Sequence, residues 1–350
     1  MAGDWTDLPD GHVLLKMSAA LPNIIEETGY YEMYGVELRV PHEDEKACPF
    51  STLIILQKFL RANDNHVSDA VKQLTAALKW RKEFQPRKVM DEVFDQSRFD
   101  GLGYVVDLKG VPGSPNEVDT CAFNIYGGVK DMKKTFGDLD GFIRWRVALM
   151  EITLDHLHLA DAKEPIPDFS YGVDPYQAFQ VHDYLSVSFL RQPSEVKAAS
   201  QKTIKLFQEM YPETMAKKYF VNVPIFMQWM FSAMQIFMAK ETIAKMKWMS
   251  YGAELHKDLG SSIPKAYGGT GPDLHIAGAT PKYDGSGAAA TASAAAAAAS
   301  ASNAENPKST QTAPSATPEP VAGPSGTNNQ SIDGEASPAA PAPGAVSVAN

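Results

Sequence analysis

The sequence predicts an α/β protein in which a small helical lobe precedes a lobe built on a mostly parallel sheet. Residues 51–84 place apolar side chains at helical spacing. From about residue 100 onward, strand-like runs alternate with helical patterns, which is typical of parallel sheets. We therefore expect a helical lobe over 1–99, a sheet lobe over 100–275 and a tail over 276–350.

Two clear helices define the helical lobe. Before them the chain is polar and loop-rich, with short helical pieces such as Leu14–Ala20. Ser51–Leu60 is the first clear helix, since its leucines recur at helical spacing. Ser68 is expected to cap a second helix that Pro86 ends.

The sheet lobe is predicted from alternating patterns. Short apolar or Val-rich runs predict four strands, at 103–108, 121–126, 179–184 and 217–223. Apolar residues at helical spacing predict two helices between them, at 142–158 and 195–210.

One uncharged stretch, Tyr219–Ala239, has the length that a membrane-spanning helix needs. Pro224 divides it, however, and leaves a helix of only about 15 residues before Lys240. Four methionines recur along that helix at spacings of three and four: Met227, Met230, Met234 and Met238. A buried core helix is one interpretation. A helix that covers an apolar cavity or touches a bilayer fits better than a span, because methionine adapts to varied apolar partners.

Composition narrows the classes of function. A net charge of −10 without a basic run gives no support to nucleic-acid binding. Cys48 and Cys121 suggest no disulfide framework, and the first residues lack the pattern of a signal peptide, so we expect a cytosolic protein. The Ala-, Ser- and Pro-rich residues 276–350, in which Tyr283 is the only aromatic residue, are expected to be disordered.

No enzyme signature stands out. The chain has no Gly-rich phosphate loop between a strand and a helix, no clustered metal ligands and no GxSxG motif. We therefore expect a protein without catalytic turnover.

Three segments resemble the CRAL-TRIO lipid-binding family: FLRANDNHVSDAVKQLTAALKWR (59–81), YPETMAKKYFVNVP (211–224) and SIPKAYGG (262–269). The resemblance covers about residues 50–275. It implies a helical N-terminal lobe packed on an α/β lobe, whose mostly parallel sheet floors an apolar pocket under a gate helix. The uncharged stretch falls where that family has its last core strand and its gate.

Within that family, three further segments look most like the fungal nonclassical phosphatidylinositol transfer proteins: FNIYGGVKDMKKTF (123–136), WRVALME (145–151) and QVHDY (180–184). This resemblance implies phosphatidylinositol binding and transfer, and heme binding in the same lobe. It also implies a cytoplasmic protein that associates peripherally with endoplasmic reticulum or microsomal membranes, with the plasma membrane as a further candidate.

The resemblance also implies site residues. His182 and Tyr184 match the iron-binding pair, with Tyr184 the axial ligand of ferric heme b through its tyrosinate. Tyr126, Arg146 and Lys218 look like supporting residues, and the two cations suit propionate carboxylates. Strand alternation is consistent with this, since it places Asn124 with Tyr126, His182 with Tyr184, and Lys218 with Phe220 and Asn222.

Other interpretations of these residues stay open. A histidine on a strand is more often a hydrogen-bonding core residue than a ligand. Arg146 could face solvent, with Arg144 the inward arginine.

The chain departs from the family's phosphoinositide contacts at two places. Gln235 stands where classical members have a basic gate residue, and the acidic headgroup partner falls near Ala198 or Ala199. Lys217 keeps a basic position that the family shares. Two functions therefore compete: phosphatidylinositol exchange with heme bound in the same lobe, and a dedicated heme-binding protein in oxidant stress with little lipid transfer.

Overall fold

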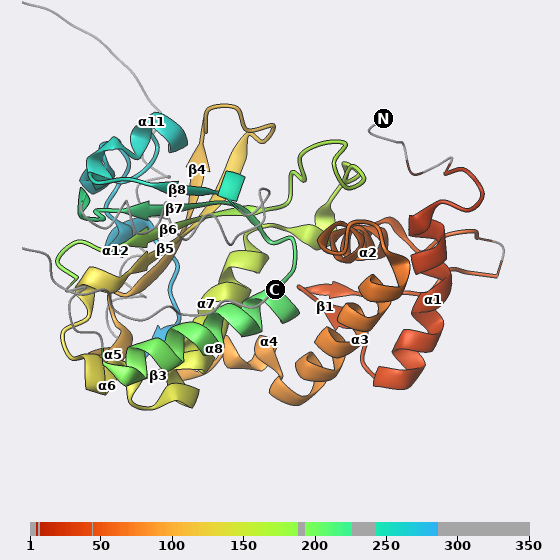
Figure 1. Cartoon of the computed structure of the whole chain (residues 1–350), viewed down its shortest axis with the longest axis horizontal. Coiled ribbons are helices and arrows are strands. Elements are labelled where there is room, and N and C mark those ends of the chain that lie inside the picture. The colour runs from red at the N-terminus through yellow and green to blue at the C-terminus, as the bar shows by residue number, and fades with distance from the viewer. Residues whose placement is uncertain (1–4, 6–7, 44, 188–192, 226–242, 286–350) are drawn as a thin grey trace, which may run out of the picture. The chain divides into compact units, whose positions relative to one another are not determined.

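The computed structural model describes residues 5, 8–43, 45–187, 193–225 and 243–285 (Figure 1). The predicted gate helix, with its methionines and Gln235, lies outside these residues apart from Ile225 at its start, and so does the chain from residue 286 onward. Among the described residues, no helix combines the length and the apolar character needed to cross a membrane.

Three helices form the N-terminal lobe, seen on the right of Figure 1: α1 (Val13–Thr28), α2 (Phe50–Ala62) and α3 (Val67–Phe84). A short hairpin of β1 (Glu32–Met33) and β2 (Val36–Glu37) lies against them. Both predicted helices are confirmed, and α1 is longer than the predicted piece. The predicted cap is wrong, since α3 begins at Val67 after His66, and Ser68 lies within the helix.

A five-stranded sheet forms the second lobe, in the order β4 (Gly103–Lys109), β5 (Val118–Ile125), β6 (Ala178–Asp183), β7 (Met215–Val221) and β8 (Met246–Trp248). Only the β4–β5 pair is antiparallel, so the sheet is mostly parallel, as predicted. Strand β8 was not predicted, because three residues with a lysine in the middle give no strand pattern.

Helices cover one face of the sheet. On that face, α7 (Leu139–Asp155) packs against β4 and β5, and α8 (Ser194–Met210) packs on α7. The contact with β4 needs a glycine, because a Cβ at Gly103 would stand 2.5 Å from a methyl carbon of Leu149. Smaller elements on this side of the lobe are α4 (Pro86–Val89), α5 (Gln96–Phe99) and α6 (Met132–Phe136).

The C-terminal segment covers the opposite face. It comprises η5 (Gly252–Glu254), α11 (His256–Leu259) and η6 (Lys265–Tyr267). Phe123, Val181 and Tyr219 from three adjacent strands form one apolar core with Leu259 and Tyr267. That face is therefore filled by the protein's own side chains.

The folded part extends beyond the predicted boundary at residue 275. After α12 (Leu274–Ala277), the strand β9 (Lys282–Tyr283) pairs with β3 (Val93–Phe94). Tyr283 is only 8% exposed, and its hydroxyl accepts a 3.2 Å hydrogen bond from the indole of Trp145. The predicted tail is thus wrong for residues 276–285, because buried Tyr283 and backbone pairing of Ala279 with Val105 and of β9 with β3 anchor this stretch.

Buried ion pairs join the two lobes. The ammonium of Lys58 on α2 donates to the Asp174 carboxylate at 2.7 Å and to the carbonyls of Tyr176 and Glu213. The Lys58 and Asp174 side chains are both fully buried. A second group is centred on Arg81 of α3, which pairs with Glu151 of α7.

Candidate functional site

A row of aligned residues crosses the sheet on its helix-covered face. Asn124, His182, Phe220 and Trp248 are register partners on the four adjacent strands β5 to β8. The Phe220 ring stacks on Trp248 with centroids 3.7 Å apart, and the His182 ring lies 5.4 Å from Phe220. The row therefore joins an aromatic surface to a histidine and an amide.

A second row lies one pleat earlier on the same face, because side chains two residues apart leave a strand together. Its register partners are Ala122, Gln180, Lys218 and Met246. Gln180 is 8% exposed and Lys218 is partly buried. The predicted placement of Lys218 on one face with Phe220 fits this register.

Two tyrosines complete the cluster from beyond the strand ends. Tyr126 and Tyr184 were predicted inside strands, but Tyr126 begins the short helix η2 (Tyr126–Gly128) and Tyr184 follows β6. The Tyr126 ring nevertheless lies 5.5 Å from the His182 ring and 5.2 Å from the Tyr184 ring. Gly127 allows this approach, since a Cβ there would collide with the carbonyl of Leu185.

Arg146 reaches the cluster from α7. Its side chain is buried at 6% exposure and donates a hydrogen bond to the side-chain oxygen of Asn124. Arg144, by contrast, pairs with Glu92 in a half-exposed position. Of the two arginines, Arg146 is therefore the inward one.

Positive charge in this cluster has no carboxylate partner among the described residues. Neither Arg146 nor Lys218 forms an ion pair there, and Asp183 accepts its hydrogen bonds from Leu185, Asn222 and Tyr267. Burial and the nearby Arg146 lower the pKa of Lys218 to about 8. The region thus holds cationic groups in excess, which suits an anionic ligand.

The histidine and the two phenols are neutral in the ligand-free protein. Burial, with Lys218 and Arg146 nearby, holds the pKa of His182 well below its usual range, and its Nε2 atom has no hydrogen-bond partner in the part of the chain that the structure describes. Burial raises the pKa of Tyr184 well above its ordinary value, with a smaller contribution from Tyr126. Burial also raises that of Tyr126, against the opposing charge of Arg146.

Five predicted site residues therefore come together: Tyr126, Arg146, His182, Tyr184 and Lys218. Asn222 does not join them, because it lies past the end of β7 at φ 58° and bonds to Asp183 and to Gly252. Gln180 was not predicted as a site residue, although its position two residues before His182 on the same strand places both side chains on one face. Trp248 could not be placed, because β8 was not predicted.

Three other lysines at β7 and β8 do not join the cluster. Lys245 pairs with Glu213 and Lys247 with Asp258, so neither is available as an unpaired cation. Lys217 leaves β7 on the face opposite Lys218, and its ammonium lies over the Tyr219 ring. Ala199, at the family's acidic position, is fully buried on α8.

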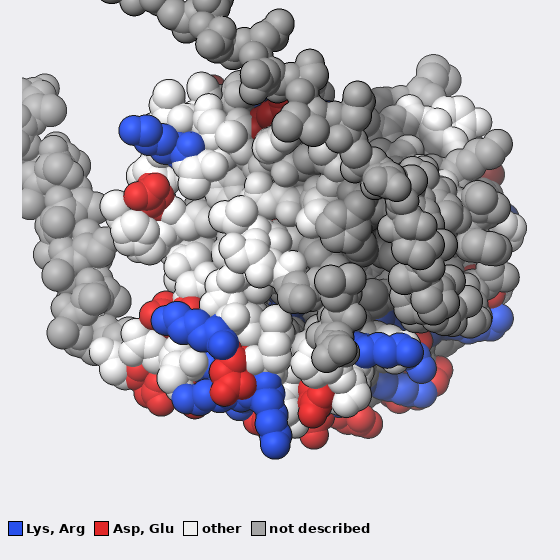
Figure 2. All heavy atoms as spheres, turned by 60° about the vertical axis from the view of Figure 1, so that its left-hand side comes forward, with Lys and Arg blue, Asp and Glu red and all other residues white. Residues whose placement is uncertain are grey.

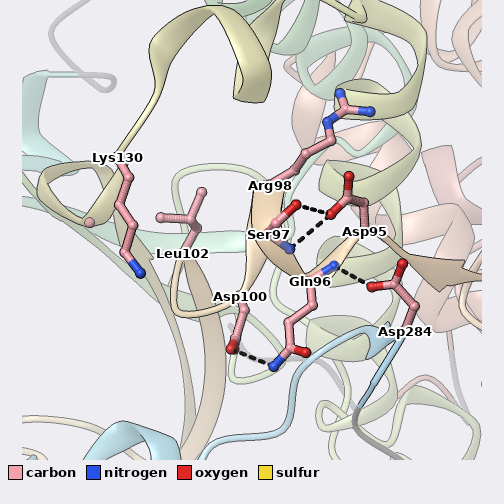
Figure 3. Close-up of a pocket in the computed structure, with 9 residues that line it drawn as sticks. Asp95, Gln96, Ser97, Arg98, Asp100, Leu102, Lys130 and Asp284 are labelled. Atoms are coloured by element: carbon pink, nitrogen blue, oxygen red, sulfur yellow. Dashed lines mark hydrogen bonds between the residues drawn. The ribbon is translucent and has the colours of Figure 1, made fainter.

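A hollow of about 520 Å³ lies beside this cluster, at the outer wall of the lobe (Figure 3). Charged and polar side chains line most of it, including Asp95, Arg98 and Lys130, and hydrogen bonds tie Asp95 to Ser97 within the wall. Leu102 lines both this hollow and a narrow void of about 10 Å³ next to Tyr126 and Arg146. The polar walls of the larger hollow do not match the apolar pocket expected from the sequence.

Lobes and site together define a two-lobed α/β protein of the CRAL/TRIO type. Residues 14–76 match the family model for the CRAL/TRIO N-terminal domain, and residues 121–269 match the model for the CRAL/TRIO domain. The chain belongs to the CRAL/TRIO family, which confirms the predicted family and fold class.

The chain is also similar to individual proteins of known name and to a solved structure. The chain is 51% identical over 270 residues to the phosphatidylinositol transfer protein SFH5 of Phaeosphaeria nodorum, covering 77% of this chain and 80% of that one. It is 46% identical over 275 residues to the protein of the same name from Cryptococcus neoformans, covering 77% and 90%. A solved structure, described as the crystal structure of Sfh5, matches with a TM-score of 0.63 at 29% identity, over 77% of this chain and 92% of that one.

Proposed function

We propose that this chain binds phosphatidylinositol and exchanges it between membranes, regulating phosphoinositide homeostasis without catalytic turnover. The supporting observation is its 51% identity to a protein named for phosphatidylinositol transfer, over most of both chains. The protein acts in the cytoplasm and associates peripherally with endoplasmic reticulum or microsomal membranes, with the plasma membrane as a further candidate.

The site's chemistry agrees with an anionic, largely apolar ligand. Arg146 and Lys218 supply positive charge that no described carboxylate neutralises, and a phosphate ester would compensate it. The stacked Phe220 and Trp248 offer apolar surface beside those cations.

A vesicle assay tests the transfer function. Donor vesicles carry labelled phosphatidylinositol, and matched donors carry labelled phosphatidylcholine as a control for leakage or fusion. We expect the protein to accelerate transfer of phosphatidylinositol only. Equal acceleration of both lipids, or of neither, would refute the proposal.

We also propose that the same lobe binds ferric heme b, because the cluster's donors fit it. His182 Nε2 is a buried nitrogen without a hydrogen-bond partner among the described residues, the Tyr126 ring lies beside it, and the Tyr184 ring lies next to that of Tyr126. Tyr184 would bind the iron with support from His182 and Tyr126, while Arg146 and Lys218 would bind the propionates. Bound heme would supply a redox-active iron. Because Tyr184 is a neutral phenol, its coordination to iron would release a proton.

An absorption spectrum of the purified protein tests this second proposal. We expect a Soret band that Tyr184→Phe removes while the far-ultraviolet circular dichroism stays unchanged. A colourless, lipid-loaded protein would refute heme binding. A heme-loaded protein that fails the transfer assay would instead favour the alternative, a dedicated heme-binding protein in oxidant stress.

A further inference from the structure

Three parallel strands each lead to an exposed apolar side chain. Leu185 follows β6, Ile225 follows β7 and Tyr251 follows β8, and they are 60%, 67% and 64% exposed. Because β6, β7 and β8 run parallel, their carboxyl ends meet at one edge of the sheet, on the left of Figure 1. Three apolar side chains are therefore presented at the same end of the lobe.

Hydrogen bonds hold the loops that present these side chains. The Asp183 carboxylate accepts from the backbone N–H of Leu185 at 2.8 Å and from the Asn222 amide at 2.7 Å. The Asn222 side-chain oxygen in turn accepts from the N–H of Gly252, directly after Tyr251. Gly252 packs so tightly that a Cβ there would stand 2.8 Å from the Asn222 amide nitrogen. The exposure of Leu185 and Tyr251 is thus built into an ordered network.

Four lysines gather at the same end of the lobe. Lys130 follows η2, which abuts the Leu185 carbonyl, and Lys133 and Lys134 lie on α6. Lys197 lies in the first turn of α8, the helix against which α6 packs. All four are exposed and form no ion pair within the described residues.

On α6 and in the first turn of α8 the lysines outnumber the carboxylates that form no ion pair among the described residues, whereas Lys130 lines the polar hollow with Asp95, Asp100 and Asp284. Asp138 and Asp140 already pair with Arg98 and Lys202. Asp131 and Glu195 are the remaining acidic residues of α6 and of the first turn of α8. On these two elements Lys133, Lys134 and Lys197 stand against two carboxylates, although the whole chain carries −10. In Figure 2, which brings this end forward, described side chains near the middle are uncharged and most charged ones lie along the lower edge.

We infer that this end of the sheet lobe is a docking surface for an anionic lipid bilayer. Leu185, Ile225 and Tyr251 enter the interface, and the lysines of α6 and α8 meet the headgroups. The inference rests on the proposed function, since Tyr184 of the ligand cluster directly precedes Leu185 and a carrier must exchange its ligand where it meets the membrane. A tyrosine suits this position because its ring prefers the headgroup region of a bilayer.

Vesicle flotation tests the surface without using the transported lipid. The vesicles contain phosphatidylcholine, with or without phosphatidylserine. We expect the wild type to bind the vesicles with phosphatidylserine, and less at high salt. Leu185→Glu with Tyr251→Glu should weaken binding about tenfold or more. Lys133→Glu with Lys134→Glu should weaken it by about fivefold for each lysine lost.

Tyr171→Glu with Val173→Glu is the matched control. These side chains are 70% and 69% exposed, but they lie in the loop before β6, at the opposite edge of the sheet. The control should bind vesicles like the wild type, and melting temperatures should show that all variants fold. Equal losses in the Leu185/Tyr251 and control variants, or no vesicle binding by the wild type, would overturn the inference. So would unchanged binding by the Leu185/Tyr251 variant, the result expected if a protein covers this face instead.

Failure of the proposed function gives a different result. Lipids extracted from the purified protein are identified by mass spectrometry in parallel. Docking variants should retain the wild-type lipid. A wild type that binds vesicles but neither contains nor transfers phosphatidylinositol would refute the transfer function and leave the docking surface standing.

Discussion

Two buried regions of this protein hold cationic side chains in opposite surroundings. At the junction of the lobes, each buried cation meets carboxylates. Lys58 pairs with Asp174, and Arg81 pairs with Glu151 and Glu32. The Tyr211 hydroxyl adds a 2.6 Å hydrogen bond to Glu151. Such a fully paired network stabilises one relative arrangement of the helices and strands that it joins.

On the sheet face the same kinds of residue lack opposite charge. Among the described residues, Arg146 forms its side-chain hydrogen bond with the Asn124 amide oxygen, and its buried Nε atom has no hydrogen-bond partner there. Lys218 has its pKa lowered by burial and by Arg146. The paired cations at the junction stabilise the fold, whereas Arg146 and Lys218 on the sheet face can pair with an anionic ligand.

The largest loss of unfolding free energy is expected for Lys58→Met, at the junction of the lobes. The change leaves the Asp174 carboxylate buried without its cation, which costs about 3–5 kcal/mol of unfolding free energy. Urea unfolding of the ligand-free protein measures it. Lys58→Met with Asp174→Leu should recover part of the loss, because an apolar pair leaves no buried charge. A single variant within about 1 kcal/mol of the wild type would contradict a stabilising role.

On the sheet face, Lys218→Met is expected to raise the free energy of unfolding, whereas Lys58→Met lowers it. Since the folded protein lowers the pKa of Lys218 from 10.5 to about 8, the charged form destabilises the fold at neutral pH. Removing the charge should stabilise the ligand-free protein by about 2–3 kcal/mol near pH 7. Between about pH 8 and pH 10.5 the unfolded chain binds more protons, so wild-type stability rises there and approaches that of the variant. A wild-type to variant difference that does not change with pH would exclude this cause.

Much of the fold was predictable because its elements have strong local patterns. The helices of the N-terminal lobe and α7 carry apolar stripes that their burial confirms. Features that depend on tertiary contacts were missed. Strand β8 is three residues long, and Tyr283 is ordered by Trp145, which is 138 positions away in the sequence.

The site was predictable by a different route. The resemblance supplied Tyr126 and Tyr184, although both lie outside the strands to which alternation had assigned them. Strand alternation alone would have placed Gln180 on the same face as His182, because the two residues are two positions apart. It failed for Asn222, where the left-handed backbone turns the side chain away from the face. A period of two predicts faces only while the strand continues.

A smaller loss of unfolding free energy is expected in acid. The loss should begin at a higher pH for the sheet face than for the junction of the lobes. The folded protein holds the pKa of His182 well below 6.5, so the unfolded chain takes up a proton first as pH falls. Stability should fall by about 1.4 kcal/mol per unit below pH 6.5, and His182→Gln should lack this loss. At the junction, where Lys245 and Arg61 lower the pKa of Glu213 against the effect of burial, the loss begins only at more acid pH. Urea midpoints across this pH range compare the two regions. Parallel profiles for the wild type and His182→Gln would show that His182 is not the cause.

The smallest effect on stability is expected at Arg144, two residues from Arg146 on α7. Arg144 pairs with Glu92 in a half-exposed position, so Arg144→Gln should cost less than about 1 kcal/mol and leave ligand content unchanged. Arg146→Gln should lose the bound anionic ligand, because Arg146 and Lys218 are the cations of the sheet face that form no ion pair with a described residue. Mass spectrometry of the bound lipid and the heme absorbance of the purified variants measure both ligands. Equal ligand loss in the two variants would mean that the overall charge of α7 matters rather than the inward position, and the distinction between structural and ligand-directed cations would fail.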